Sequence, residues 1–232
     1  MKIIKNIFEL NKAIKNYKNI GFVPTMGGIH RGHASLIKSS QRKNLKTIVS
    51  IFVNPTQFNK KKDFNSYPRN IINDIQILKK LKVDYLFKPS FSDIYNFKTK
   101  NKIYLDKFSN ELCGQFRKGH FRGVIDVVNR FIEIIEPKRI LLGNKDYQQL
   151  FLIKKHVKKN KINTKIFPCK TIRNKHFIAY SSRLNKLNHN EINKLKKIIK
   201  FLRNYKRALI SKKYAHNYHK IKNKLLSLGA KK

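Results

Sequence analysis

Acidic residues are scarce in this 232-residue chain, which has 12 Asp and Glu against 54 Lys and Arg and a formal net charge of +42. Glycine and proline number only nine and six, and the chain shows no internal repeats and no disordered linker. The two cysteines, Cys113 and Cys169, match no metal or redox motif and indicate a reducing, cytoplasmic setting. No apolar run approaches membrane-spanning length, and the first residues lack the apolar segment of a secretory leader. We therefore expect a cytoplasmic protein without a membrane role.

The excess of positive charge would ordinarily indicate a nucleic-acid partner. Here lysine far outnumbers arginine and is spread along the whole chain, together with much Asn, Ile, Phe and Tyr. AT-rich codons encode that set of residues, so selection for binding is not needed to explain it. We expect weak, salt-sensitive electrostatic attraction and no specific nucleic-acid partner.

Strand-like and helix-like patterns alternate through the first 170 or so residues. Apolar runs predict strands at 20–23, 47–53, 85–88, 103–105, 139–142 and 165–168, and helical periodicity predicts helices at 34–42, 70–81, 124–135 and 147–158. This alternation is typical of an α/β, Rossmann-like, doubly wound and mostly parallel sheet with helices on both faces. Ligands of such folds collect at the carboxyl ends of the strands.

The chain changes character from Ser181 onward, where two helical patterns and no strand are found. Asn188 is expected to cap the first helix, with Glu191 completing a capping box. The second is expected from about Lys213 to Leu228, ending at Gly229. We expect these basic amphipathic helices to pack on the main domain rather than on a membrane. The predicted organisation is a nucleotide- and substrate-binding domain at 1–172 and a shortened, mainly helical appendage at 173–232.

The segment from Pro24 to His33, PTMGGIHRGH, carries the strongest functional signal. It follows a predicted buried strand and leads into a helix expected to begin near Arg31. His30 and His33 are three residues apart, so both rings project from one side of the first helical turn. A helix N-terminus offers N–H groups and partial positive charge to phosphate, and glycines allow the backbone to approach a ligand closely. The alternative is a tight turn with two surface histidines.

Several further blocks occur with this segment, in order and at compatible spacing over about the first 190 residues. They are VPTMGGIHRGHASLI (23–37), SIFVNPTQF (50–58), YPR (67–69), RKGHFRGV (117–124), GNKDYQQL (143–150) and SSR (181–183). On these blocks the chain resembles the pantoate–β-alanine ligases, which belong to the HxGH nucleotidylyltransferase-like superfamily.

The resemblance implies that ATP and pantoate form pantoyl adenylate with loss of pyrophosphate, and that β-alanine then displaces AMP to give pantothenate. ATP is thus a substrate, Mg²⁺ is expected with it, and a homodimer is implied. Two alternatives remain: a related nucleotidylyltransferase, and a catalytically eroded remnant that binds nucleic acid non-specifically.

Site residues follow from the resemblance, block by block. His33 is implied as the proton donor, with a pKa that modest shifts would bring near neutrality. His30, Lys145 and Arg183 are implied as further catalytic residues. Gln57 is implied to bind pantoate and β-alanine, and Gln149 to bind pantoate. The implied ATP-binding residues are Met26, Gly27, Gly28, Ile29, His30, Arg31, Gly32, His33, Gly143, Asn144, Lys145, Asp146, Ile172, Tyr180, Ser181, Ser182 and Arg183.

The chain departs from the family pattern at three points. Cys113 and Asn144 stand where the family usually has Glu. The C-terminal domain, which closes over the nucleotide in the family, is expected to be shortened, so its closure is in question. For a metal ion, no convincing protein ligand can be named, and Asp74 is only a possibility.

Overall fold

The computed structural model describes residues 1–43, 45–211 and 217–230. The chain divides into two compact units, Met1–Thr171 (unit 1) and Ile172–Lys232 (unit 2). Each unit is described by itself.

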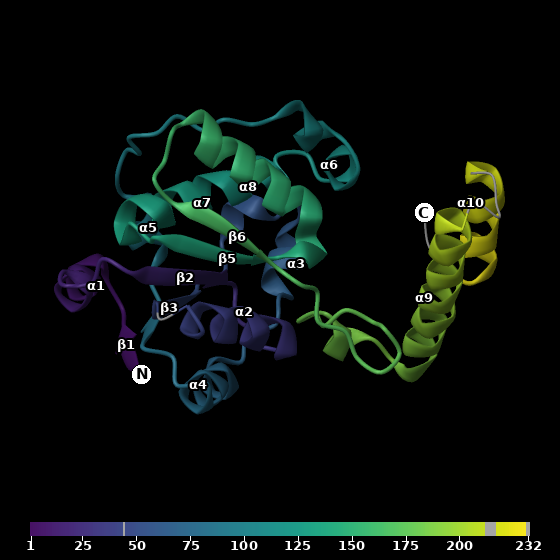
Figure 1. Ribbon diagram of the computed structural model, residues 1–232, viewed down its shortest axis with the longest axis horizontal. Coiled ribbons are helices and arrows are strands. Elements are labelled where there is room, and N and C mark those ends of the chain that lie inside the picture. The colour runs from purple at the N-terminus through teal and green to yellow at the C-terminus, as the bar shows by residue number, and fades with distance from the viewer. Residues whose placement is uncertain (44, 212–216, 231–232) are drawn as a thin grey trace. The chain divides into compact units, whose positions relative to one another are not determined.

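Unit 1 is built on one six-stranded sheet in which every pairing is parallel (Figure 1). Its strands are β1 (Lys2–Ile4), β2 (Ile20–Thr25), β3 (Lys46–Ile51), β4 (Tyr85–Phe87), β5 (Arg139–Gly143) and β6 (Lys165–Cys169), in the spatial order β1-β4-β3-β2-β5-β6. The predicted α/β class with a parallel sheet is confirmed. Because β2 lies between β3 and β5, the direction of winding reverses at β2, which is the type of position where doubly wound folds bind ligands.

Helices cover both faces of the sheet. They are α1 (Ile7–Ile14), α2 (Arg31–Gln41), α3 (Lys61–Asn65), α4 (Ile71–Lys80), α5 (Phe91–Tyr95), α6 (Cys113–Phe116), α7 (His120–Ile135) and α8 (Tyr147–Lys159), with short 3₁₀ turns η1 (Pro55–Gln57), η2 (Lys107–Asn110) and η3 (Asn144–Asp146). In Figure 1, α2 and α4 lie on one face and α5, α7 and α8 on the other.

The hydrophobic core is likewise divided into one cluster on each face of the sheet, because successive residues of a strand point to opposite faces. Phe22 and Ile48 are register partners and pack in the cluster that contains Phe131 of α7. Their neighbours Val23 and Val49 pack in the other cluster, which α2 and α4 complete. Since both faces are covered, these strands are near-continuous apolar runs, and this is why the sequence revealed them.

The predicted strand at 103–105 is wrong. Ile103 and Leu105 pack against a buried cluster around Phe121 of α7, and the N–H of Tyr104 donates to Nδ1 of His156 at 3.2 Å. Their apolar character therefore serves helix packing rather than sheet pairing. Conversely, the sequence analysis missed β1, whose three residues are too few to show a periodic pattern.

Unit 2 contains η4 (Leu184–Lys186), α9 (His189–Ile210) and α10 (Tyr218–Ser227). The predicted cap of α9 is confirmed. Oδ1 of Asn188 accepts the N–H of Glu191 at 2.9 Å, and the carboxylate of Glu191 accepts the N–H of Asn188 at 3.0 Å. The predicted start of the second helix near Lys213 lies outside the described residues. Its end is confirmed at Gly229, which has φ +89°. No described residue of α9 or α10 is buried.

Candidate functional site

Polar residues of three connections meet at the carboxyl edge of the sheet. The glycine turn and His30 follow β2, Asn54 and Gln57 follow β3, and Lys145 follows β5. These segments touch: Nε2 of Gln57 lies 3.3 Å from the sulfur of Met26, and Lys145 is close enough to lower the pKa of both His30 and His33. The neighbours β3, β2 and β5 thus form the floor of one site.

The glycine turn after β2 is fixed by the protein itself. Gly27 and Gly28 have φ of +82° and +63°, in the left-handed region where other residues are strained. The N–H of Gly27 donates to Oγ1 of Thr25 at 3.1 Å, and the hydroxyl of Thr25 donates in turn to the carbonyl of Ser50 on β3 at 2.6 Å. The turn is therefore tied to both central strands.

Asp74, in the first turn of α4, holds the rest of this turn. Its carboxylate accepts the N–H of Gly28 at 2.9 Å and that of Ile29 at 2.7 Å, and the residue is 1% exposed. The N–H groups of Gly28 and Ile29 are therefore bound within the protein. Both carboxylate oxygens of Asp74 accept backbone N–H groups, so Asp74 has a structural role in holding the turn.

The predicted helix start at Arg31 is confirmed, and two histidines cap it. Nδ1 of His30 accepts the N–H of Gly32 at 3.1 Å, and Nδ1 of His33 accepts the N–H of His30 at 3.4 Å. The two rings stack with centroids 4.0 Å apart. A neutral imidazole carries one proton, so rings that accept at Nδ1 must carry it on Nε2. Each ring therefore accepts one backbone N–H at Nδ1 and carries its own N–H on the opposite side, at Nε2.

Both histidines are neutral at physiological pH. Burial, then His30, then Lys145 lower the pKa of His33 from 6.5 to about 3. Burial and Lys145 also lower the pKa of His30, against the opposite effect of Asp146. The shift at His33 is far larger than the modest one expected from sequence. What this helix N-terminus offers a ligand is thus a pair of neutral Nε2–H donors.

Gln57 is oriented by Asn54, a residue to which the sequence analysis assigned no role. Asn54 is 1% exposed, and its amide N–H₂ donates to Oε1 of Gln57 and to the carbonyl of Gly123, both at 3.2 Å. Its oxygen accepts the hydroxyl of Tyr95 at 2.9 Å. Because Asn54 fixes the oxygen of Gln57, the amide N–H₂ group of Gln57 must face Met26.

The turn that carries Gln57 requires a glycine at position 123 of α7, because it packs closely against that residue. A Cβ added at this position would lie 2.5 Å from the carbonyl oxygen of Thr56 and 2.9 Å from the nitrogen of Gln57. Next to it, Nδ1 of His120 lies 2.7 Å from the carbonyl oxygen of Gln57. Helix α7 therefore presses directly on the backbone that carries the Gln57 side chain.

The two glutamines that begin α8 have different environments. Gln148 is buried, and its N–H₂ donates to the carbonyls of Phe108 and Glu111 at 2.7 Å while its oxygen accepts the N–H of Cys113 at 3.1 Å. Gln149 is partly buried, and its side chain has no hydrogen bond within the described part of the chain. Gln148 is thus structural, whereas the side-chain amide of Gln149 is not engaged by the described part of the chain.

Residues 143–146 follow β5 at the same edge of the sheet. Nζ of Lys145 lies 2.8 Å from Oδ1 of Asp146, and both side chains are largely exposed. The side chain of Asp146 makes no capping hydrogen bond to α8, although Asp146 stands at the N-cap position. Asn144 is exposed, as is Cys113, the other departure from the family pattern.

The remaining predicted ATP-binding residues belong to unit 2. Tyr180 donates its N–H to the carbonyl of Ile172 at 3.1 Å, and Arg173 pairs with Ala179 in an antiparallel bridge. The N–H of Arg183 donates to Oγ of Ser181 at 3.2 Å, and its guanidinium is exposed. These contacts gather the residues in one short loop.

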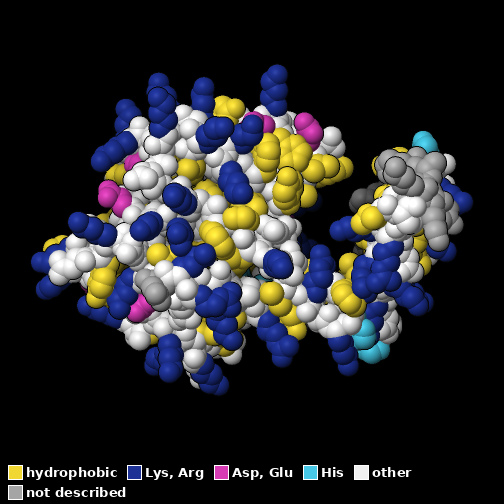
Figure 2. Space-filling view, viewed as in Figure 1, with side chains coloured by type: hydrophobic (Ala, Val, Ile, Leu, Met, Phe, Trp, Pro, Cys, Tyr) yellow, Lys and Arg dark blue, Asp and Glu magenta, His cyan; other side chains and the backbone are white. Residues whose placement is uncertain are grey.

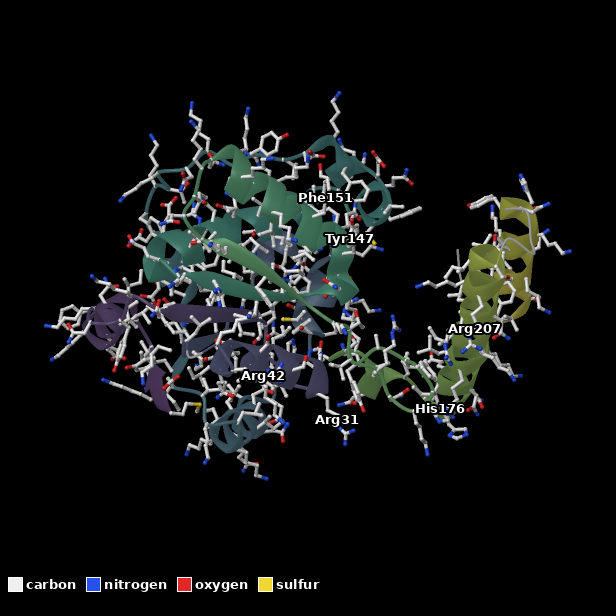
Figure 3. The ribbon with its side chains drawn as sticks, in the orientation of Figure 1. Arg31, Arg42, Tyr147, Phe151, His176 and Arg207 are labelled. Carbon is white, nitrogen blue, oxygen red and sulfur yellow. The ribbon has the colours of Figure 1, made fainter. Side chains whose placement is uncertain are left out.

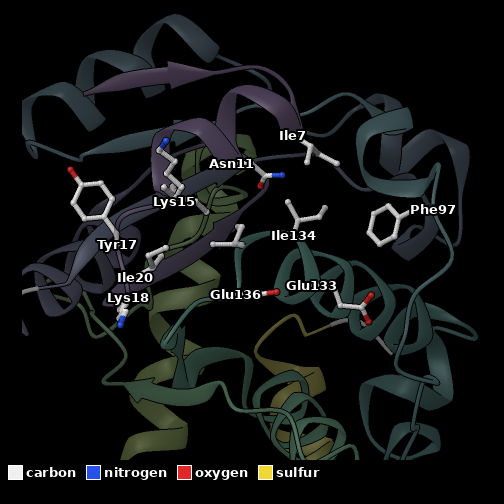
Figure 4. A pocket seen from close by; sticks show the side chains of 12 residues that line it. Ile7, Asn11, Lys15, Tyr17, Lys18, Ile20, Phe97, Glu133, Ile134 and Glu136 are labelled. Carbon is white, nitrogen blue, oxygen red and sulfur yellow. The ribbon is translucent and has the colours of Figure 1, made fainter.

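Three other observations bear on function. In the described part of the chain no helix is long and apolar enough to cross a membrane, and no group of three or more His, Cys, Asp or Glu could hold a metal ion. Lysines and arginines are scattered over the visible face rather than gathered in a patch (Figure 2). The hollow in Figure 4 lies at the amino end of β2, beside Ile20 and Lys18, so it is remote from the histidines.

Comparisons with known proteins point to one family. The family model described as pantoate-beta-alanine ligase matches residues 2–231. The pantothenate synthetase of Helicobacter acinonychis is 42% identical over 213 residues, which are 90% of this chain and 77% of that protein. The pantothenate synthetase of Francisella tularensis subsp. novicida is 42% identical over 231 residues, covering 98% and 85%. The crystal structure of pantoate-beta-alanine ligase from Francisella tularensis, complexed with beta-gamma ATP and beta-alanine, superposes with a TM-score of 0.88 at 41% identity, covering 99% of this chain and 86% of that one.

Proposed function

We propose a residue-level mechanism from the premise that this chain belongs to the pantoate–beta-alanine ligase family, and is therefore an enzyme that joins pantoate to β-alanine. The carboxylate of pantoate attacks the α-phosphorus of ATP, and pyrophosphate leaves. The amine of β-alanine then attacks the acyl carbon of the pantoyl adenylate, and AMP leaves with the electron pair of the broken C–O bond. The observation that carries this proposal is the pair of stacked histidines at the start of α2, presenting two neutral donors where β2 ends.

The histidine pair is suited to the phosphates of ATP. Negative charge grows on the departing pyrophosphate, and preorganised donors in a partly buried site stabilise such charge strongly. His33 and His30 supply the Nε2–H groups, and Lys145 supplies a nearby positive charge. We propose that the triphosphate, once bound, raises the pKa of His33 so that it becomes the proton donor to the leaving group.

The other ATP contacts are proposed separately for each unit. In unit 1 they are residues 26–33 and 143–146, and in unit 2 they are Ile172 and residues 180–183. The guanidinium of Arg183 offers the paired donors that suit phosphate oxygens. Mg²⁺ is proposed to enter with ATP and to be held largely by phosphate oxygens and water, as is usual for this ion.

Pantoate is proposed to bind between Gln57 and Gln149. Amides suit a hydroxy acid because each offers donors and an acceptor without adding charge. Gln57 has its amide N–H₂ toward Met26 and the site, and Gln149 has an unengaged amide in the described chain. We assign β-alanine to Gln57 as well.

We also propose a cytoplasmic homodimer that associates through unit 1. Leu112, Phe116 and Tyr147 are 59%, 84% and 61% exposed. A hydrogen bond from the backbone N–H of Cys113 to Oε1 of Gln148 connects α6 to α8. Tyr147 and Phe151 lie near each other on α8 (Figure 3). Phe116→Glu should convert a dimer to a monomer in light-scattering measurements, whereas a monomeric native protein would refute this assignment.

The decisive assay follows pyrophosphate and AMP separately. With ATP, Mg²⁺ and pantoate, the protein should release pyrophosphate and form pantoyl adenylate, and added β-alanine should then yield pantothenate and AMP. Omitting pantoate should abolish both signals. If no adenylate forms, the chain is an eroded remnant; if another acceptor replaces pantoate, it is a different nucleotidylyltransferase. The likeness to pantothenate synthetases favours neither alternative.

A further inference from the structure

We propose that Asp74 is a positioning residue that sets the place of both histidines by clamping the backbone just before them. The inference rests on the proposed function and adds to it a residue that no family block contains. Asp74 lies on α4, 46 positions along the chain from Gly28, and reaches the turn only through the fold.

The clamp is a buried carboxylate held by two neutral peptide N–H groups. The three ion pairs found among the described residues do not include Asp74. A carboxylate removed from water must be compensated, and the short bonds from Gly28 and Ile29 supply this. The space is also tight, because a Cβ on Gly27 would lie 3.0 Å from Oδ2 of Asp74.

Three consecutive N–H groups are thereby accepted by the protein: Gly27 by Thr25, and Gly28 and Ile29 by Asp74. The next residue, His30, donates its N–H to the ring of His33. The backbone N–H groups of residues 27 to 30 are therefore all hydrogen-bonded within the protein, and the last of them is bonded to an imidazole. A shift of Ile29 must move His30, and with it both Nε2–H donors.

At position 74 only a carboxylate can accept the N–H of Gly28 on one oxygen and the N–H of Ile29 on the other. An amide at position 74 would offer one oxygen, and its N–H₂ group would face a backbone N–H. One buried donor would then lose its partner, and the turn would relax toward a geometry that satisfies it. Because a misplacement of about 1 Å costs up to about a hundredfold in rate, Asp74→Asn should affect turnover without any direct contact with substrate.

The test compares Asp74→Asn with Asp84→Asn. Asp84 precedes β4 at the opposite edge of the sheet, where it accepts the N–H of Thr47 at 2.8 Å and pairs with Lys46. Both substitutions remove one charge and one acceptor of a backbone N–H. We expect kcat for adenylate formation to fall at least about tenfold in Asp74→Asn, with KM for pantoate changed less than about twofold, and to change less than about twofold in Asp84→Asn.

A spectroscopic readout separates positioning from a general loss of stability. Nitrogen-15 spectra of the histidine rings should show protonated Nε2 and unprotonated Nδ1 for His30 and His33 in the native protein and in Asp84→Asn. In Asp74→Asn these signals should become averaged between tautomers. Wild-type tautomers together with wild-type kcat in a folded Asp74→Asn would overturn the proposal. So would unchanged tautomers with a Mg²⁺ requirement raised more than about threefold, since Asp74 would then bind the metal.

A third measurement needs no variant, in case Asp74→Asn does not fold. The amide protons of Gly28 and Ile29 should exchange slowly with solvent in the native protein, both with and without ATP and Mg²⁺. Loss of the protection or a large shift of these amides on adding ATP would show that the phosphates take them from Asp74. If the native protein forms no pantoyl adenylate, the proposed function fails, but the ring tautomers and amide exchange still test the clamp.

Discussion

The large pKa depression at His33 makes a quantitative prediction about stability. The folded-state pKa is about 3 and the ordinary value is 6.5, so the unfolded chain binds a proton at this residue that the folded protein refuses. Stability from His33 is therefore fully present above about pH 6.5 and is lost as the pH falls toward 3. Between pH 7.5 and pH 5 the loss is about 2 kcal/mol.

His33→Gln isolates this contribution. Glutamine at the third helical position is the usual partner in a capping box, so it can accept the N–H of His30 in place of the imidazole without titrating. At pH 7.5 the variant should unfold at nearly the same urea concentration as the native protein. Between pH 7.5 and pH 5 the free energy of unfolding of this variant should fall by about 2 kcal/mol less than that of the native protein, because the side chain at position 33 can no longer take up a proton on unfolding.

The assay is urea unfolding followed by circular dichroism at the two pH values. His219→Gln, which changes an exposed histidine of α10, is the matched control and should keep the native pH dependence. Equal pH dependence in His33→Gln and the native protein would refute the argument that His33 is held neutral by its surroundings. In the same variant, adenylate formation at pH 7.5 should fall at least about a hundredfold, since an amide cannot replace the imidazole as the proposed proton donor.

Three further outcomes are expected. Gly123→Ala should raise KM for pantoate at least about tenfold and lower the unfolding free energy by about 1–3 kcal/mol, because its Cβ displaces the turn at Thr56; an unchanged KM in steady-state kinetics would contradict this. Lys145→Ala should lower adenylate formation about a hundredfold with an unchanged circular dichroism spectrum, and a near-native rate would remove Lys145 from the site. DNA and RNA should bind weakly, without sequence preference and with a steep loss as salt rises in fluorescence anisotropy titrations; selective binding at physiological salt would revive a nucleic-acid role.

The sheet and the start of α2 could be predicted from the sequence because their signals are local. Five of the six strands are short apolar runs, and in the central strand β2 the adjacent buried residues Phe22 and Val23 show that both faces of the sheet are covered. The two glycines, the histidine spacing and the cap at Asn188 each depend on residues within a few positions of one another. The motif blocks likewise made Gln57 and Lys145 candidates without knowledge of what surrounds them, and the structure places both at the carboxyl edge of the sheet.

What only the tertiary structure decided involves partners far apart in the chain. Asp74 lies 45 positions from Ile29, and Asn54 lies 69 positions from Gly123, so no periodicity or motif could pair them. The strand expected at 103–105 failed for the same reason, because the buried neighbours of its apolar side chains come from α7 and α8. The lowered pKa of His33 follows from burial, from its neighbour His30 and from Lys145, and of these the burial and the approach of Lys145 depend on the fold. Local sequence thus predicted which residues form the candidate site, whereas long-range contacts determine the hydrogen-bonding direction and the charge of their side chains.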